Sequence, residues 1–291
     1  MLIDLSDRAK LRVAGPDRIR FLNGQLTNDL TNLKPGFSVY ACALSAKGKI
    51  CADLFATPLE DAVMLDYDSV LRDAIPARLE KYLIADEVEL EDVTDQFALF
   101  HVCHTMLSDT IFPEGIVTTN NRFAVNGQDL LLPVTLKNVV PNLLKETPLT
   151  DSETEQFRIE QGIPRWGAEL SEEIIPNEAG LDVRAISYTK GCYLGQEIIS
   201  RIKSLGHVNR YLRGIRLIDG SELQAADKLV QEDGKPIGTV TSACRSARLD
   251  SWIGLAFLKR GFDRPGAVYS VSRSMTSSLI GSAEVRSLPS V

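Results

Sequence analysis

Residues 190–197 of this sequence read KGCYLGQE, and a helical pattern follows them at once. The pattern consists of apolar residues spaced three or four positions apart: Leu194, Ile198, Ile202 and Leu205. Gly206 is a typical helix stop, so the spacing predicts a loop that leads into one helix. Cys192 would then lie at or just before the helix N-terminus. The helix dipole lowers the pKa of a thiol there, and Lys190 would act in the same direction.

A thiol at this position has two interpretations. A lone cysteine is commonly a small buried hydrophobic residue. The flanking glycines, Lys190 and the predicted helix start instead favour a functional Cys192. Gln196 lies one turn beyond Cys192 on the same side, away from the apolar stripe. Glu197 and Arg201 form an i, i+4 pair with the acid first, which stabilises a helix.

These residues also carry a family resemblance. The stretch KGCYLGQE is similar to the signature of the YgfZ-type folate-binding proteins, which are relatives of the aminomethyltransferase (T protein) of the glycine cleavage system. Five further stretches resemble that family in the same order along the chain: FLNGQLTNDL at 21–30, LSAKGK at 44–49, RIEQGIP at 158–164, PNEAGL at 176–181 and DGKPIGTVTS at 233–242. The resemblance covers nearly the whole chain, and its most specific part is the eight-residue stretch.

The sequence pattern predicts an α+β body followed by an all-β region. Strand-like and helix-like segments alternate up to about residue 204 without a regular βαβ period. After residue 208, short apolar strands are separated by turns such as Asp233-Gly234, which is typical of a small barrel. The resemblance implies a GcvT-like ring of α+β subdomains around a central cavity. Residues 1–204 would form a folate-binding region of two subdomains, and residues 208–291 a C-terminal antiparallel β-barrel.

The periodicity also predicts individual elements. Helices are expected over residues 16–26, 69–83, 135–145 and 150–161. Ser69 would be the N-cap of the second helix and Pro76 would bend it. A hairpin is expected around residues 46–48, and further strands over residues 62–67, 87–93, 97–103 and 129–134.

Composition limits the class of protein. The chain has 291 residues, of which 44% are hydrophobic and 24% charged, as expected for a globular protein of about two domains. No apolar run predicts a membrane helix, and the N-terminus resembles neither a signal nor a transit peptide. The five cysteines are scattered without a CxxC pair. This favours a reducing cytoplasm over a disulfide framework or a self-contained zinc site.

The net charge of −7 is unevenly distributed. Residues 146–182 contain ten acids and two arginines, whereas residues 184–216 contain seven Lys or Arg and one acid. These segments are either solvated faces or the walls of a pocket for an anionic tail, such as a folate glutamate chain. The overall acidity argues against direct nucleic-acid binding.

The resemblance implies a site for tetrahydrofolate or a one-carbon derivative of it. Glu160 and Glu178 would face the pterin, because its amide and amino edge matches a carboxylate; the alternative is two surface acids. Arg201 would bind the folate carboxylates. The other cofactor-binding residues expected from the resemblance are Asn28, Asp29, Tyr193 and Gln196. Cys192 would be a redox or cluster-handling thiol, with Lys190 beside it.

Two classes of function follow. An accessory protein would serve the assembly or repair of iron–sulfur cluster enzymes and so affect cluster-dependent tRNA modification. Its partners would be iron–sulfur assembly proteins or client cluster enzymes. An aminomethyltransferase would instead move a one-carbon unit from a lipoyl-linked amine to tetrahydrofolate. The cysteine signature favours the first class, because aminomethyl transfer needs no thiol; whether the protein is an enzyme stays open.

Two histidines offer a metal site that the pattern does not favour. His101 and His104 lie three residues apart around Cys103. The segment is strand-like, so residues three apart point to opposite faces. No metal site is therefore expected.

Overall fold

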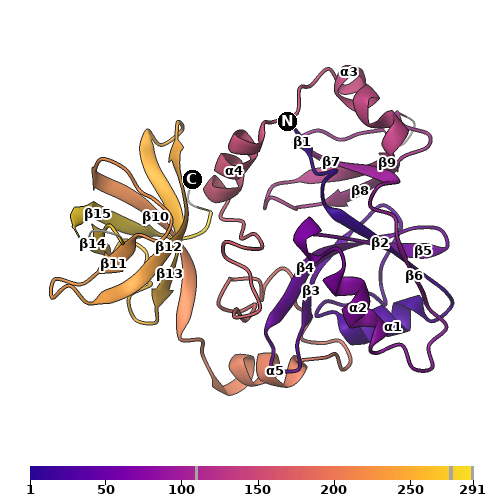
Figure 1. Cartoon of the computed structure of the whole chain (residues 1–291), viewed down its shortest axis with the longest axis horizontal. Coiled ribbons are helices and arrows are strands. Elements are labelled where there is room, and N and C mark those ends of the chain that lie inside the picture. Colours follow the sequence, from indigo (N-terminus) through magenta and orange to yellow (C-terminus); the bar gives the residue numbers. More distant parts are fainter. Residues whose placement is uncertain (109–110, 275–277, 290–291) are drawn as a thin grey trace. The chain divides into compact units, whose positions relative to one another are not determined.

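The computed structural model describes residues 1–108, 111–274 and 278–289, and the chain falls into two compact units. Unit 1 consists of residues 1–150 and 182–200, and unit 2 consists of residues 151–181 and 201–291. Each unit is discontinuous in sequence, because the chain passes between them after residues 150, 181 and 200 (Figure 1).

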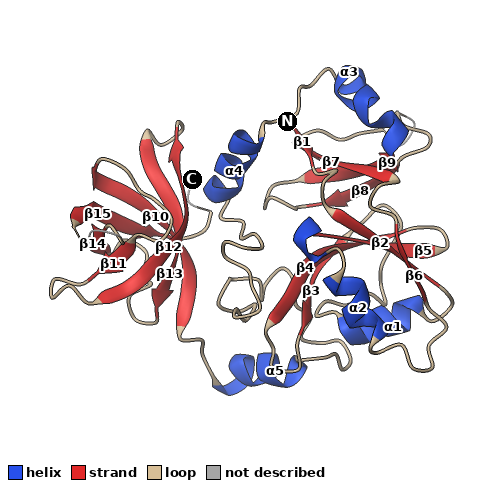
Figure 2. Ribbon diagram, viewed as in Figure 1, coloured by secondary structure: helices blue, strands red, loops and turns tan. Residues whose placement is uncertain are grey.

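A five-stranded antiparallel sheet forms the first part of unit 1, in the order β3-β4-β5-β2-β6 (Figure 2). Its strands are β2 (Ala9–Ala14), β3 (Val39–Leu44), β4 (Ile50–Pro58), β5 (Ala62–Tyr67) and β6 (Glu89–Asp92). Strands β3 and β4 form the predicted hairpin, and every residue of β5 is buried. Helices α1 (Arg18–Gln25) and α2 (Ala74–Glu80) bury Leu22, Ile75 and Leu79.

A four-stranded antiparallel sheet forms the second part of unit 1, in the order β1-β7-β9-β8. Its strands are β1 (Leu2–Asp4), β7 (Phe97–Cys103), β8 (Ile116–Asn120) and β9 (Gly127–Pro133). Leu2, Phe100 and Leu130 share a core with Val140 of helix α3 (Val140–Leu144). The sequence pattern predicts β7 and β9 but not β1 or β8, which are too short to show a clear alternation.

Unit 2 contains a closed antiparallel barrel in the order β10-β13-β12-β11-β14-β15. Its strands are β10 (Arg210–Gly220), β11 (Lys228–Val230), β12 (Pro236–Ser246), β13 (Ser251–Lys259), β14 (Val268–Ser272) and β15 (Leu279–Arg286). Ile215, Leu229, Val240 and Leu258 lie in the barrel core. The predicted α+β class with a C-terminal antiparallel barrel is therefore confirmed, although the pattern did not predict β15.

Two further helices flank the barrel in sequence. Helix α4 (Asp151–Glu160) contacts strands β12 and β13 and lies within the predicted segment 150–161. Helix α5 (Gln196–Leu205) follows the KGCYLGQE stretch, as predicted, and the boundary between the two units falls inside it, after Ser200.

Two predicted helices are shorter than expected. The segment 69–83 forms a 3-10 turn (Ser69–Leu71) followed by α2, in which Pro76 occupies the first turn. The N-cap is Asp68 rather than Ser69, because the Asp68 carboxylate accepts a hydrogen bond from the Val70 N–H. The segment 135–145 likewise forms a 3-10 turn (Val134–Val139) followed by α3.

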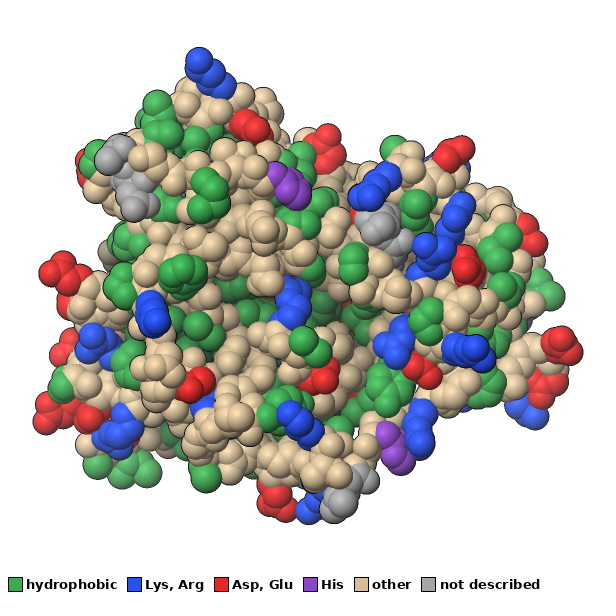
Figure 3. All heavy atoms as spheres, turned by 180° about the vertical axis from the view of Figure 1, so that it is seen from behind, with side chains coloured by type: hydrophobic (Ala, Val, Ile, Leu, Met, Phe, Trp, Pro, Cys, Tyr) green, Lys and Arg blue, Asp and Glu red, His purple; other side chains and the backbone are tan. Residues whose placement is uncertain are grey.

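No helix in the described ranges is both long and apolar enough to cross a membrane. Figure 3 shows acidic and basic side chains interspersed over the visible face of the molecule.

Candidate functional site

Two of the family-like stretches lie side by side in unit 1. Residues 21–30 contain the end of α1, and residues 184–197 contain the KGCYLGQE loop. The Leu194 N–H donates to the Gly24 carbonyl over 3.0 Å, and the Ser187 N–H donates to the Thr27 carbonyl over 3.0 Å. The Thr27 hydroxyl donates to the Ala185 carbonyl over 2.6 Å. The later segment is therefore fixed on the earlier one by its main chain.

Lys190 is the centre of this arrangement. Its ammonium donates to three carbonyl oxygens that follow or end α1, those of Asn23 at 2.7 Å, Leu26 at 2.8 Å and Asn28 at 2.6 Å. The ammonium also lies 5.3 Å from the centre of the Tyr193 ring. Burial lowers the pKa of Lys190 to about 8. The Lys190 side chain thus caps the C-terminal end of α1 and fixes the loop that carries Cys192.

The helix after this loop begins at Gln196, two residues later than its apolar pattern indicates. Gly195 has a φ of +86°, which is incompatible with helix, so it delays the start. A Cβ on Gly195 would lie 2.5 Å from the Ser45 carbonyl oxygen, so the absent side chain lets the loop pack on the β3–β4 hairpin. The Gln196 amide oxygen accepts a hydrogen bond from the Tyr193 N–H over 3.1 Å, which fixes the turn.

Cys192 is exposed on this loop, four residues before the helix. The other thiols lie in strands, as expected: Cys42 and Cys103 are buried, and Cys51 and Cys244 are half-buried. Burial raises the pKa of Cys42, and it raises the pKa of Cys103 to about 11 and of Cys244 to about 12. Solvent therefore reaches Cys192 more freely than any other thiol of the chain.

Asn28 and Asp29 lie at the edge of the same loop. The Asn28 amide donates to the Tyr40 carbonyl over 2.9 Å, and its oxygen accepts from the Asp29 N–H. The Asp29 carboxylate accepts from the N–H and hydroxyl of Thr31, and these bonds lower its pKa. Lys190 lies close enough to act in the same direction. Asn28 therefore shapes the turn, and Asp29 keeps a negative charge beside it.

Glu160 belongs to unit 2 and ends helix α4. It is buried, and its Oε1 accepts from the Ser246 hydroxyl over 2.7 Å and from the Gln156 amide over 3.1 Å. No bond within the described ranges goes to Oε2. Because an ionised carboxylate has about four acceptor positions, Oε2 can still accept from a ligand.

Glu178 and Arg201 also belong to unit 2. The Glu178 carboxylate is buried and pairs with Arg210 at the start of β10, with Oε1 3.1 Å from the arginine Nε. Its Oε2 accepts from the Ile175 N–H over 3.1 Å. Arg201 is exposed on α5. The site residues predicted in unit 1 therefore lie together around Lys190. Those predicted in unit 2, Glu160, Glu178 and Arg201, each have different surroundings.

One candidate functional residue was not predicted from the sequence, a carboxylate within the β3–β4 hairpin. Asp53 of β4 accepts a hydrogen bond from the Tyr40 hydroxyl over 3.0 Å. Desolvation raises the pKa of Asp53. The Arg184 guanidinium lies 5.6 Å from the Tyr40 ring centre. A carboxyl with a raised pKa is a candidate proton acceptor. The only sequence signal was an acid inside the apolar run ICADLFA, directly after the LSAKGK stretch.

The histidines do not form a metal site. His101 is fully buried, and its Nδ1 lies 2.7 Å from Asp129 Oδ1. His104 is exposed in the turn after β7. No group of three His, Cys, Asp or Glu side chains suited to a metal ion occurs within residues 1–108, 111–274 and 278–289.

Comparison with known proteins agrees with this fold. A model of the GCVT N-terminal domain matches residues 1–103, and a model of the glycine cleavage T-protein C-terminal barrel domain matches residues 210–285. The tRNA-modifying protein YgfZ of Serratia proteamaculans is 30% identical over 274 residues, covering 87% of this chain and 82% of that protein. The chain belongs to the glycine cleavage T-protein family.

Relatives within the family carry different names. The mitochondrial iron–sulfur cluster assembly factor IBA57 homolog of Dictyostelium discoideum is 27% identical, covering 72% of this chain. This chain spans only 60% of the length of that relative. An aminomethyltransferase of Thermosipho melanesiensis is 27% identical over 90% of this chain and 78% of its own length.

A solved structure confirms the family fold. The glycine cleavage system aminomethyltransferase T of Bartonella henselae superposes with a TM-score of 0.85, covering 100% of this chain and 86% of that one, at 20% identity. At this identity the likeness concerns the fold alone.

Proposed function

We propose that this family member is a tetrahydrofolate-binding accessory protein for the assembly or repair of iron–sulfur cluster enzymes, and that it thereby affects cluster-dependent tRNA modification. The observation that carries this proposal is the exposed Cys192 on a loop fixed by Lys190. The names of the Serratia and Dictyostelium relatives agree with it. Cys192 is then the redox or cluster-handling thiol, with iron–sulfur assembly proteins or client enzymes as partners.

The folate ligands in unit 2 are proposed to be Glu160, Glu178 and Arg201. Glu160 is held by Ser246 through one oxygen, which leaves the other for the pterin edge. Arg201 is exposed and suits the folate carboxylates. The residues of unit 1 proposed to contribute to folate binding are Asn28, Asp29, Tyr193 and Gln196.

Asp53 supports an alternative function. Its raised pKa and its hydrogen bond to Tyr40 are those of a candidate general base. The aminomethyltransferase of Thermosipho is also among the relatives. In this alternative the protein transfers a one-carbon unit to tetrahydrofolate, and Cys192 has no chemical role.

Complementation of a deletion strain separates the two functions. We expect the Cys192→Ser variant to fold normally but to fail in restoring the activity of a cluster enzyme, because serine is neither a thiolate nor a soft ligand. Cys51→Ser is the matched control, since Cys51 is half-buried in the same unit. Full rescue by Cys192→Ser, together with glycine-cleavage activity that Asp53→Asn abolishes, would establish the alternative.

Calorimetry with tetrahydrofolate tests the ligand-binding part. Glu160→Gln keeps an acceptor for Ser246 but removes the charge. We expect its affinity to fall about tenfold, as for loss of a charged hydrogen bond. Glu172→Gln is the control, because Glu172 is an exposed acid of the same unit. Absence of folate binding to the unaltered protein would refute this part of the proposal.

A further inference from the structure

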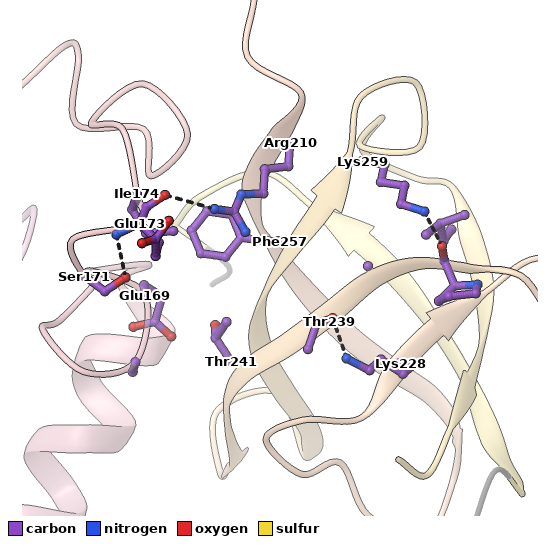
Figure 4. Close-up of a pocket in the computed structure, with 14 residues that line it drawn as sticks. Glu169, Ser171, Glu173, Ile174, Arg210, Lys228, Thr239, Thr241, Phe257 and Lys259 are labelled. Atoms are coloured by element: carbon purple, nitrogen blue, oxygen red, sulfur yellow. Dashed lines mark hydrogen bonds between the residues drawn. The ribbon is translucent and has the colours of Figure 1, made fainter. Parts of the chain in front are cut away.

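A hollow lies on the outside of the barrel, and one of its lining residues, Arg210, pairs with Glu178. It has a volume of about 560 Å³ and is bounded by residues 168–174 and by strands β10 to β13 (Figure 4). All of its lining residues belong to unit 2. This volume is within the range of small-molecule sites, which is about 300–1,000 Å³.

The wall of the hollow is a cross-strand row. Lys228 of β11 is paired with Thr239 of β12, which is paired in turn with Phe257 of β13. Neighbouring residues of the same strands, such as Leu229 and Leu258, lie in the barrel core. Because side chains alternate along a strand, the row must face outward.

Positive charges gather on this outward face. Arg210 and Lys259 are directly opposite each other on β10 and β13, a position in which like charges destabilise a sheet. Glu178 compensates Arg210. Lys259 instead donates to the Pro236 carbonyl over 2.8 Å, and Lys228 donates to the Thr239 hydroxyl over 2.9 Å. Within the ranges that the structure describes, neither lysine forms a salt bridge, so this face has two cations without paired carboxylates, beside one exposed acid, Glu173.

The one buried acid in the lining does not supply them. Glu169 is 1% exposed, and its carboxylate is paired with Arg158 at 3.0 Å and accepts from the Ser242 hydroxyl over 2.6 Å. Its charge is therefore already neutralised on the α4 side of the hollow.

The spacing of the two lysines selects the shape of the ligand. Lys228 and Lys259 stand on β11 and β13 with β12 between them, so their strands are roughly 10 Å apart. A second hollow of about 420 Å³ shares Lys228 and Pro236 with the first and continues to Arg273. Lys228 donates to Thr239 and Lys259 to the Pro236 carbonyl, three residues apart on β12, so an extended chain with several charges can contact both ammonium groups where they stand.

We propose that this outer face of the barrel binds a linear polycarboxylate, with Lys228 and Lys259 as its charge partners. Two sources share this chemistry: the γ-linked glutamate tail of a folate and an acidic peptide segment of a partner. The two lysines are not among the proposed pterin ligands, although Arg210 of the same lining pairs with Glu178.

Calorimetry at low ionic strength with the peptide tetraglutamate tests the proposal. We expect the unaltered protein to bind it, and Lys228→Gln and Lys259→Gln each to weaken binding about tenfold. Lys235→Gln is the matched control, because this exposed lysine pairs with Asp233 and lines neither hollow. We expect the control to change affinity by less than about twofold.

Three results would overturn the proposal: no binding of tetraglutamate at millimolar concentration, an equal loss in Lys235→Gln, or equally tight binding of inorganic phosphate. The source is decided with folates carrying one or four glutamates. If Lys228→Gln weakens binding of the tetraglutamyl form alone, the tail is the ligand; if it weakens only the peptide, the ligand is a partner. Binding of the monoglutamyl form reports the proposed function separately.

Discussion

Each unit holds one connecting segment in place, and the two units do so by different interactions. In unit 2, residues 151–181 are tied down by nearly buried charges, with Arg158 paired to Glu169 and both bonded to Ser242 of the barrel. In unit 1, residues 184–197 are held by main-chain carbonyls around the Lys190 ammonium and by the close approach of Gly195. Unit 2 compensates its buried charges, whereas unit 1 leaves Asp53 with a raised pKa and a thiol in solvent. This difference is typical of a structural region and a reactive one.

Removal of Arg158 should have the largest effect. Arg158→Met leaves the Glu169 carboxylate buried without its cation, and we expect a loss of about 3–5 kcal/mol in the free energy of unfolding. Urea denaturation followed by tryptophan fluorescence measures this in unit 2, because both tryptophans, Trp166 and Trp252, belong to it.

Arg165→Met is the control for this prediction. Arg165 is exposed and pairs with Glu155, which also pairs with Arg158. Its removal should change the free energy of unfolding by less than about 1 kcal/mol. Equal effects of the two substitutions would show that the buried pair is not what holds the segment.

A methyl group on Gly195 should have the next largest effect. Gly195→Ala combines a left-handed φ of +86° with a Cβ 2.5 Å from the Ser45 carbonyl, and we expect a loss of about 3 kcal/mol. Gly191→Ala is the control, since a Cβ there would meet nothing within 4 Å. Pulsed alkylation of Cys42 during urea denaturation reports unit 1, where this thiol is buried. Similar losses for both glycines would contradict the close contact.

Lys190→Met should have a smaller effect than Gly195→Ala. It removes three hydrogen bonds from one ammonium, but the carbonyls are uncharged, so we expect a loss of about 2 kcal/mol. The same alkylation assay measures it. The loop should also become accessible to protease, whereas tryptophan fluorescence of unit 2 should not change. No loss would mean that the glycine contact alone holds the loop.

Asp53→Asn should stabilise the protein. The raised pKa of Asp53 means that its ionised form opposes folding, so the amide should add up to about 1 kcal/mol at neutral pH. This gain should disappear below about pH 4, where the carboxyl is protonated in the folded and unfolded chains. Asp66→Asn is the contrasting control. Asp66 pairs with Arg122 and Arg8, so its replacement should destabilise the protein. Destabilisation by both substitutions would show that the charge of Asp53 is compensated in the folded protein, as that of Asp66 is.

Sequence reasoning reached the fold through periodicity and turns. Strands such as β5 and β7 match their predicted limits, because uninterrupted apolar residues and flanking turns determine both ends. It failed at β1, whose partner β7 lies far away in the chain, and at β15, which closes the barrel between the nearby β14 and the distant β10. A local pattern cannot show the burial that the distant partners supply. The helix after KGCYLGQE was predicted, but its start was displaced because the φ of Gly195 is set by packing on Ser45.

The candidate site could be predicted from the sequence only in part, for the same reason. The exposure of Cys192 follows from its glycine-rich loop, and the sequence alone suggested it. The partners of Lys190 are three carbonyls some 160 residues earlier, which no motif encodes. The pKa of Asp53 is raised by burial in the folded chain, and its hydrogen-bond partner Tyr40 lies across the hairpin. Residue types were therefore predictable, whereas their electrostatic environment was not.

The discontinuous units have a consequence for biosynthesis. A ribosome releases the first 150 residues before the segment 182–200 that completes unit 1, and the intervening residues 151–181 belong to unit 2. While that segment is still in the exit tunnel, the carbonyls at the end of α1 lack their hydrogen bonds from Lys190, and the hairpin lacks its contact with Gly195. An incomplete N-terminal unit must therefore be kept from aggregating until residues 182–200 have left the tunnel, so the yield of folded protein should respond to translation rate and chaperone supply.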